Sequence, residues 1–237
     1  MPVLTDWTLE LEADQVLRGQ GADPATVRAR RPALVAIAER ALQVGVPLLQ
    51  PRVAFERLEA RGLRHERLSL DGGALHGALI AQHLGRAEQV VLIVCTIGEA
   101  LEASVAQEMD ADPVFGLALD GLGSAAVESL AGLACSRFEE QTAVRGWNAS
   151  LPLSPGMIGW PVAEGQAQIF SLLDPGLAGV RLTDSGMMIP RKSLSLVLGL
   201  GEEVASGASA CSACSLNAAC RYQDHYPADP PPAFTGP

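Results

Sequence analysis

The sequence predicts a mixed α/β protein of the α+β class, followed by a short C-terminal tail that binds metal. Three observations lead to this prediction. Val90–Cys95 is an unbroken apolar run, which is typical of a strand buried on both faces. Asp112 and Pro113 open the longest helical region, which extends to about Thr142. Near the end of the chain, a C-x2-C-x5-C-x4-H pattern is formed by Cys211, Cys214, Cys220 and His225.

The composition indicates a globular protein and narrows the range of its partners. Hydrophobic residues make up 48% of the 237 residues and charged residues 19%, and the formal net charge is −10. We find no apolar run close to the roughly 20 residues of a membrane span. The densest basic cluster is Arg28, Arg30 and Arg31, whereas nucleic-acid binding needs a basic face. We therefore expect a protein or small-molecule partner, with no nucleic acid and no membrane.

The N-terminus and the cysteine usage predict a cytoplasmic protein in two parts. Asp6 stands where a secretory signal carries Lys or Arg, and the cysteines number five, which is odd. In the cytoplasm, thiols stay free or bind metal rather than form disulfides. We divide the chain into a body, residues 1–206, and a Cys-rich tail with a flexible Pro-rich end, residues 207–237.

The first elements follow from alternation and helical spacing. Thr8–Glu12 alternates apolar and polar residues, which predicts a short strand. Asp23 and Pro24 supply a helix N-cap and a first-turn proline. A second helix is predicted from Pro32 to Gly45, because apolar residues recur there on one helical face.

Two strands and a helix are predicted next. The strands lie at residues 53–58 and 66–70 and are joined through Gly62. The helix follows and carries Leu75, Leu79, Ile80 and Leu84 on one side. His76 and His83 would then share a helix face. Two histidines on a surface helix are ordinarily solvated, so we expect no metal site there.

The long helical region after Asp112 is rich in small residues. Its glycines and alanines weaken a helix but let another element approach closely, so we expect tight helix packing rather than a ligand-facing role. Asp120 and Glu128 lie near one face of this helix. We expect them to be solvated or paired, with contact to a cationic ligand as the alternative.

The segment 148–161 cannot form regular structure, because three prolines fix φ and remove donors while two glycines permit positive φ. Ordered loops of this length are often functional. A helix is predicted at residues 164–173 and is closed by Asp174, Pro175 and Gly176. A short strand with a Met-Met turn follows, and then an alternating strand at residues 191–199.

Several of these segments together resemble one family. The sequence is similar to the C-terminal activation domain, which binds S-adenosylmethionine, of cobalamin-dependent methionine synthase, and more closely to stand-alone proteins of that superfamily. The likeness spans about residues 90–199, and residues 31–70 more loosely. The segments that show it are Leu153–Pro161, Gln168–Leu173, Val180–Ser193 and the helix Asp120–Glu128.

This resemblance implies a fold, a role and a site. In the synthase, the domain presents S-adenosylmethionine to a corrinoid that has oxidised to its inactive form, and an electron donor reduces the cobalt before methyl transfer. The implied fold is a curved, mostly antiparallel sheet flanked by helices. The implied ligand-binding residues are Ser154, Pro155, Gly156, Met157, Thr183, Asp184 and Ser185.

The chain departs from the family pattern at two positions of the ligand motif. The synthase motif has the form Arg-x-x-x-Gly-Tyr, and here Pro152 stands at the arginine position and Met157 at the tyrosine position. An arginine would meet the carboxylate of the methyl donor with a bidentate, charge-assisted pair. Its replacement removes that contact, so S-adenosylmethionine would have to bind through the remaining groups of the site.

The tail is an addition to the synthase domain that resembles one in stand-alone relatives. Three clustered cysteines favour a metal over free thiols. Zinc would be held by Cys211, Cys214, Cys220 and His225 as a closed site. A [4Fe–4S] cluster would take the three cysteines and a fourth ligand, which is His225, Cys135 or an exogenous group. Because corrinoid reactivation needs a low-potential electron, the cluster is the preferred interpretation.

We therefore predict an accessory or reactivation protein of a corrinoid-dependent methyltransferase system, with a corrinoid protein as partner and cobalamin supplied through it. The alternative is a non-catalytic binding module with a structural zinc site that has lost S-adenosylmethionine binding. A methyltransferase for an unrelated substrate is third, since no glycine-rich dinucleotide fingerprint follows Val90–Cys95.

Overall fold

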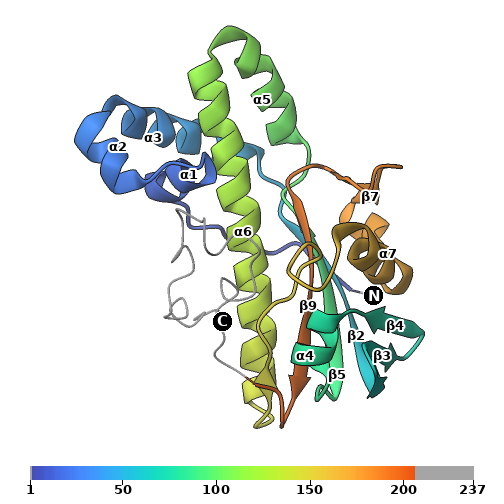
Figure 1. Cartoon of the computed structure of the whole chain (residues 1–237). Helices are drawn as coiled ribbons and strands as arrows, with labels where there is room; N and C mark the ends of the chain where they lie inside the picture. Colours follow the sequence, from blue (N-terminus) through green and yellow to red (C-terminus); the bar gives the residue numbers. More distant parts are fainter. Residues whose placement is uncertain (1, 206–237) are drawn as a thin grey trace.

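A curved antiparallel sheet of seven strands forms the centre of the molecule (Figure 1). The computed structural model describes residues 2–205. The strands follow the order β4-β3-β2-β5-β9-β6, and the short β1 pairs with β2. Their bounds are β1 Val3–Leu4, β2 Arg52–Arg64, β3 Arg67–Leu70, β4 Gly73–His76, β5 Gln89–Thr96, β6 Asn148–Ala149 and β9 Ser193–Gly201.

The predicted apolar strand is confirmed as the middle of this sheet. β5 pairs with β2 on one side and with β9 on the other, and Cys95 lies opposite Val53 and Leu194. Residues 90–96 are all buried, because each face of β5 is covered by a separate apolar cluster. The alternating strand at 191–199 is confirmed as β9, with Leu196 and Leu198 on one face and Val197 on the other.

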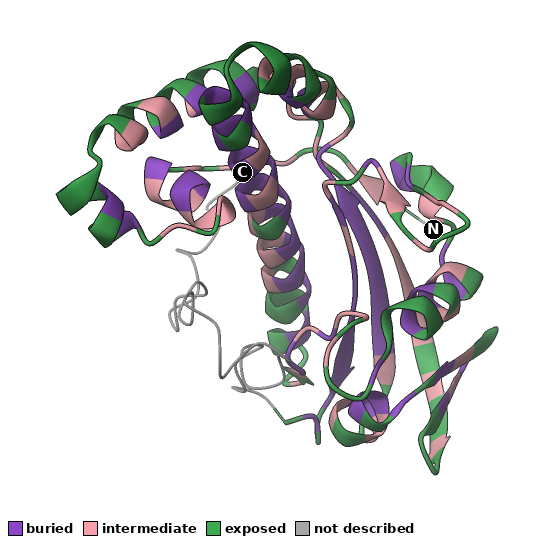
Figure 2. Ribbon diagram, turned by 45° about the horizontal axis from the view of Figure 1, so that its top comes forward, coloured by how far each residue is buried: buried purple, intermediate pink, exposed green. Residues whose placement is uncertain are grey.

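One long helix crosses one face of the sheet, and the other helices of this layer pack mainly on that helix or on each other (Figure 1). Figure 2 shows buried residues along this helix and along the central strands that face it. These helices are α1 Ala13–Gly19, α2 Pro24–Arg30, α3 Ala33–Gly45, α5 Ala100–Ala111 and α6 Pro113–Ala143. α6 is long and apolar enough to cross a membrane by length and composition, but 67% of its most apolar window is buried inside the protein.

The small residues of α6 let α1 pack against it at close range. A Cβ atom added to Gly121 would lie 2.7 Å from the carbonyl oxygen of Val16, which no real side chain tolerates. A Cβ atom on Gly19 would collide with the backbone of Gly121 in the same way. The expectation of tight helix packing is therefore confirmed for this part of α6.

The other face of the sheet is covered by shorter elements and by a long loop. A second apolar cluster lies there, with the fully buried Trp160 as its largest side chain. The elements are α4 Ala78–Leu84, α7 Val162–Leu172, the hairpin of β7 Arg181–Leu182 and β8 Met188–Ile189, and the 3-10 helix Pro175–Ala178. A second 3-10 helix, Val46–Leu48, follows α3.

Three local predictions were wrong. Residues 8–12 form no strand; Leu9 and Leu11 instead pack their side chains on the helical cluster, and Glu12 caps α1. Gly62 does not end a strand, because β2 continues through a register shift there and turns at residue 65. His76 and His83 do not share a helix either, since Gly77, at φ 152°, separates β4 from α4.

Candidate ligand-binding site

The loop that the resemblance points to is ordered and begins on the sheet. Leu153 exchanges two backbone hydrogen bonds with Val197 of β9, at 3.0 and 2.9 Å. Beyond it the chain closes a tight turn, in which the Gly156 N–H donates to the Trp160 carbonyl at 2.8 Å. Gly156 has φ 102° and Gly159 has φ 87°, so glycine is required at both. The prediction of an irregular ordered loop is confirmed for residues 150–161, but it was wrong for Asn148 and Ala149, which form the short strand β6.

Trp160 anchors the far end of this loop in the second apolar cluster. Its indole N–H donates to Oε1 of Gln168 on α7 at 3.3 Å. The same oxygen accepts the backbone N–H of His76 at 2.8 Å, and the Gln168 amide donates to the His76 carbonyl at 3.2 Å. Gln168 therefore ties the loop to β4 with all its polar atoms in use.

The second predicted segment forms the turn between β7 and β8. Thr183 is its centre: its backbone N–H donates to the Met187 carbonyl at 2.8 Å, and its hydroxyl accepts the Met187 N–H at 3.0 Å. The hydroxyls of Thr183 and Ser185 lie 2.9 Å apart. Asp184 and Ser185 are exposed. The turn thus presents two hydroxyls and one carboxylate at the surface.

Helix α7 brings the two segments together. A Cβ atom on Gly165 would lie 2.9 Å from the ring of Pro155, so the loop packs directly on the helix. At the next position, Oε1 of Gln166 lies 3.7 Å from where a Cβ of Gly186 would stand. Ser154–Met157 and Thr183–Gly186 therefore contact neighbouring positions of one helix. The loop and the turn that carry the predicted ligand residues both lie beside α7.

The polar groups of this site are bordered by exposed apolar side chains. Ile158 is 62% exposed, Met187 53% and Val162 49%. Met157 is turned inward instead: its sulfur accepts the backbone N–H of Ser154 at 3.4 Å, and its side chain packs on the second cluster. The site offers hydrogen-bonding groups and an apolar border, which is an arrangement for binding rather than for proton transfer.

Sequence reasoning missed Gln166. This side chain is only 7% exposed, and its Oε1 has no hydrogen-bond partner among the described residues. A glutamine in a helix carries no signal of burial by itself. The weak signal is its position, between Gly165 and Ile169 on the turns of α7 that face the core.

A second polar cluster connects the helices to β9. Lys192, the only lysine of the sequence, lies just before β9, and its side chain is 17% exposed. Its ammonium group lies 2.9 Å from Asp120 and donates to the Ser124 hydroxyl at 2.9 Å. Its backbone N–H donates to Glu102 at 3.0 Å. Asp120 is therefore paired and Glu128 is exposed, which agrees with the expectation that each would be solvated or paired.

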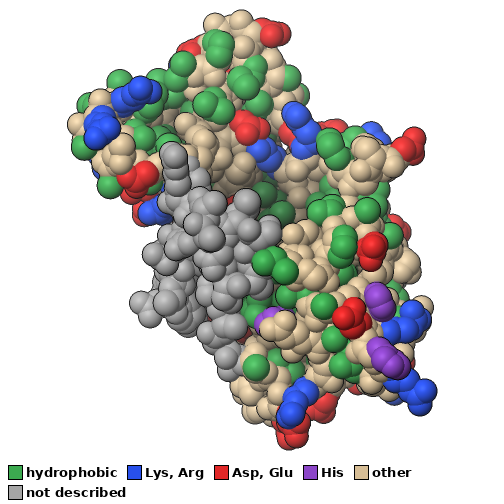
Figure 3. All heavy atoms as spheres, viewed as in Figure 1, with side chains coloured by type: hydrophobic (Ala, Val, Ile, Leu, Met, Phe, Trp, Pro, Cys, Tyr) green, Lys and Arg blue, Asp and Glu red, His purple; other side chains and the backbone are tan. Residues whose placement is uncertain are grey.

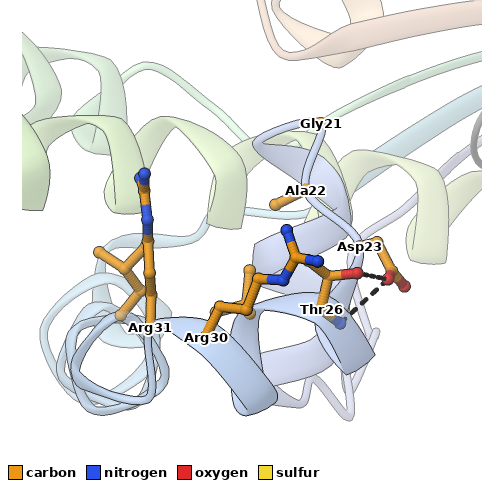
Figure 4. A pocket seen from close by; sticks show the side chains of 8 residues that line it. Gly21, Ala22, Asp23, Thr26, Arg30 and Arg31 are labelled. Carbon is orange, nitrogen blue, oxygen red and sulfur yellow. Dashed lines mark hydrogen bonds between the residues drawn. The ribbon is translucent and has the colours of Figure 1, made fainter.

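Two hollows of the described residues lie away from the predicted ligand residues. One, of about 490 Å³, lies between α1, α2 and the start of α3, and Figure 4 shows the side chains of Arg30 and Arg31 pointing in different directions there. Another, of about 570 Å³, is bordered by Glu99, Glu102 and Arg191. On the face in Figure 3, acidic and basic side chains are interspersed, without a broad basic area.

The predicted metal ligands Cys211, Cys214, Cys220 and His225 lie outside the described residues. Between residues 2 and 205, no group of three or more His, Cys, Asp and Glu side chains could hold a metal ion. Cys135 is described: it is buried in the helical cluster, where burial raises the pKa of its thiol. A metal ligand has to be a thiolate, so Cys135 is a poor candidate for the fourth ligand.

Among comparisons with known proteins, only the comparison with solved structures gives a match. No protein-family model and no curated protein matches the chain. Among solved structures, the chain is similar to the MetH reactivation domain bound to AdoHcy, with a TM-score of 0.62 and 15% sequence identity over 88% of this chain and 81% of that one. This likeness confirms the predicted fold class. The chain has the fold of the MetH reactivation domain.

Proposed function

We propose that this protein binds S-adenosylmethionine between the loop Ser154–Met157 and the turn Thr183–Ser185, and presents the methyl donor to a corrinoid protein. One observation supports this above the others. Two segments that are 26 residues or more apart in the sequence meet on α7, in a fold that a solved neighbour uses while bound to AdoHcy.

The side chains present suit such a ligand. S-adenosylmethionine carries hydroxyls, an amino group and an amino-acid end, which call for hydrogen-bonding partners around an apolar pocket. Thr183, Ser185 and Ser154 supply hydroxyls, and Asp184 supplies a carboxylate that would attract the cationic end of the donor. The corrinoid would supply the methyl-accepting cobalt, and this chain would bind and orient the donor.

The border of the site suits a docked partner. Ile158 and Val162 follow the loop Ser154–Met157 in sequence, Met187 follows the turn Thr183–Ser185, and all three are exposed in the isolated chain. Covering apolar surface of this kind stabilises a complex. A corrinoid protein placed over this border would bring its cofactor to the donor and exclude water from it.

The reductive half of the proposal concerns the tail. We propose that Cys211, Cys214 and Cys220 hold a [4Fe–4S] cluster that relays the electron to the corrinoid, with His225 or an exogenous group as fourth ligand. In the alternative, zinc takes the three thiolates and His225 and has a purely structural role.

Two measurements test the proposal. Calorimetry with S-adenosylhomocysteine should show saturable binding that Asp184→Asn and Thr183→Val weaken, and its absence would favour the alternative of a binding module that has lost this ligand. Protein prepared without oxygen should contain iron and sulfide and absorb visible light, and Cys211→Ala should remove both signals. Colourless protein loaded with zinc would refute the electron relay but leave the ligand site unaffected.

The alternative function has one observation in its favour. Pro152 and Met157 replace the arginine and tyrosine of the synthase motif, and Met157 is engaged with its own loop. A module that keeps the fold and recognises only a protein partner would tolerate both changes. It would bind a corrinoid protein with the same affinity whether or not S-adenosylhomocysteine is present.

A further inference from the structure

We propose that Gln166 is a specificity residue of the ligand site, and that its Oε1 accepts a hydrogen bond from an N–H group of the ligand. This inference rests on the proposed function and adds to it a residue that the resemblance does not supply. It identifies the chemical group by which the protein would select its ligand.

The first step is the burial of an unpaired acceptor. Gln166 is 93% buried, yet Oε1 finds no donor among the described residues. A buried amide oxygen without a partner has lost its hydration and gained nothing in return, so it lowers the stability of the fold. Native proteins seldom keep such a group unless something else fills the position, such as water or a ligand.

The second step is the space beside this oxygen. Gly186 of the β7–β8 turn has φ 79°, and the place of its missing side chain holds only one atom within 4 Å, which is Oε1 of Gln166. No side chain of the turn therefore stands between this position and the acceptor. Oε1 itself is closed to solvent in the free protein, so a donor group would reach it only after the turn shifts to admit the ligand.

The third step is the contrast with Gln168, two residues along the same helix. Gln168 uses its amide to bind His76 and Trp160, so its polar atoms are satisfied by the protein. Gln166 has the same side chain and no such partner. A purely structural glutamine would look like Gln168, and the difference indicates that the partner of Gln166 comes from outside the chain.

The fourth step is the chemistry of the donor. A carbonyl oxygen accepts hydrogen bonds and donates none, so the ligand has to bring an N–H or O–H group. S-adenosylmethionine and S-adenosylhomocysteine have two N–H groups, the 6-amino group of adenine and the ammonium group of the amino-acid end, and two ribose hydroxyls. We assign Oε1 to one of the N–H groups. If Gln166→Met weakens the binding of both methylthioadenosine and S-inosylhomocysteine, the donor is a ribose hydroxyl and the assignment to an N–H group is refuted.

Binding and stability together test the inference. We expect Gln166→Met, which keeps the length of the side chain, to weaken S-adenosylhomocysteine about tenfold, the effect of one hydrogen bond. The same change should leave the melting temperature of the free protein unchanged or higher, because an unpaired polar atom is removed. Gln168→Met is the matched control and should lower the melting temperature, since three hydrogen bonds are lost.

Two ligand variants identify the donor. Methylthioadenosine lacks the amino-acid end, and S-inosylhomocysteine lacks the 6-amino group. If the ammonium group binds Oε1, Gln166→Met and the wild type should bind methylthioadenosine equally. If the adenine amino group binds it, the two proteins should bind S-inosylhomocysteine equally.

The outcomes separate this inference from the proposed function. If the wild type binds S-adenosylhomocysteine and Gln166→Met binds it within twofold, the role of Gln166 is refuted and the ligand site stands. A fall in melting temperature as large as that of Gln168→Met would also refute it, because it would reveal a structural role. If the wild type fails to bind, the proposed ligand and this inference both fall.

A substitution at Gly186 tests whether the donor group of the ligand reaches Oε1 past this glycine. Gly186→Ala should place a methyl group over Oε1 and weaken ligand binding about tenfold or more. Gly146→Ala is the control for backbone strain, since Gly146 has nearly the same φ, 76°, and open space around it. Equal loss of binding in both variants would refute this path for the donor group.

Discussion

The two faces of the sheet differ in how their glycines are packed and in whether their buried polar groups have partners. On the helical face, the backbone of Gly121 lies against Gly19 and the backbone of Val16 lies against Gly121, and the half-buried Lys192 has both Asp120 and Ser124 as partners. On the face that carries α7, the side-chain position of Gly186 is approached by Oε1 of the buried Gln166, and this oxygen has no partner in the described chain. The polar groups of the first face are satisfied within the protein, whereas the second face keeps an unmet acceptor, which we assign to a ligand.

The largest effect is expected where the ligand loop is anchored. Trp160→Ala should lower the free energy of unfolding by about 3–5 kcal/mol, because it empties the largest buried position of the second cluster. Urea unfolding measures it. Trp147→Ala is the control, since Trp147 is only partly buried against the helical cluster and should cost less. Equal losses would mean that Trp160 does not anchor the loop.

The close packing of the helical face should be broken by a single methyl group. Gly121→Ala brings a Cβ atom into the backbone of α1 and should cost about 1–3 kcal/mol of unfolding free energy. Gly132→Ala, on the same helix but with no atom within 4 Å, should instead be neutral or stabilise by up to about 1 kcal/mol. The comparison fails if both substitutions change the stability in the same direction.

The polar cluster of the helical face should contribute less to the free energy of unfolding than the close packing of α1 on α6. A double-mutant cycle of Lys192→Met and Asp120→Asn should give a coupling energy of about 1 kcal/mol, because solvent still reaches both groups. Raising the salt concentration should reduce it. A coupling near zero would show that this pair contributes nothing to the rigidity of the helical face.

The smallest effect concerns the two buried thiols. Burial raises the pKa of Cys95 to about 12, and the pKa of Cys135 is raised in the same way. Both thiols are therefore protonated near pH 8, when a free cysteine is already partly ionised. An alkylating reagent should leave both unmodified in the native protein and label them after denaturation. Labelling of either at the rate of a free thiol would contradict the closed packing of this face.

The sequence was most informative where one local pattern decides the structure. β5 and α6 were predicted nearly to the residue, because an unbroken apolar run and a capped, long helical region allow few alternatives. The loop 150–161 was equally clear, since its prolines and glycines exclude regular structure, whereas Asn148 and Ala149 pair with β9. The approach of Pro155 and Gly186 to one helix was not predicted, because the resemblance implied only that the loop and the turn share a ligand.

The errors lie where distant contacts decide. Alternation at residues 8–12 suits a strand, but these residues have no strand to pair with and pack on helices instead. Leu75 fits the spacing of the α4 helix, but its segment pairs with β3. The environment of Gln166 depends on a turn twenty residues away. No local pattern contains that information.

The single lysine also bears on how the chemistry of the cell can alter this protein. Acylation of lysine is a common way to remove positive charge from a surface. Here the other basic side chains are arginines, and the one ε-amine is held between α6 and the start of β9. Arginine keeps its charge across the physiological pH range. The arginine charges of this surface are therefore fixed by the sequence. Lysine acylation can remove positive charge only at Lys192, where it would loosen the contact between α6 and β9.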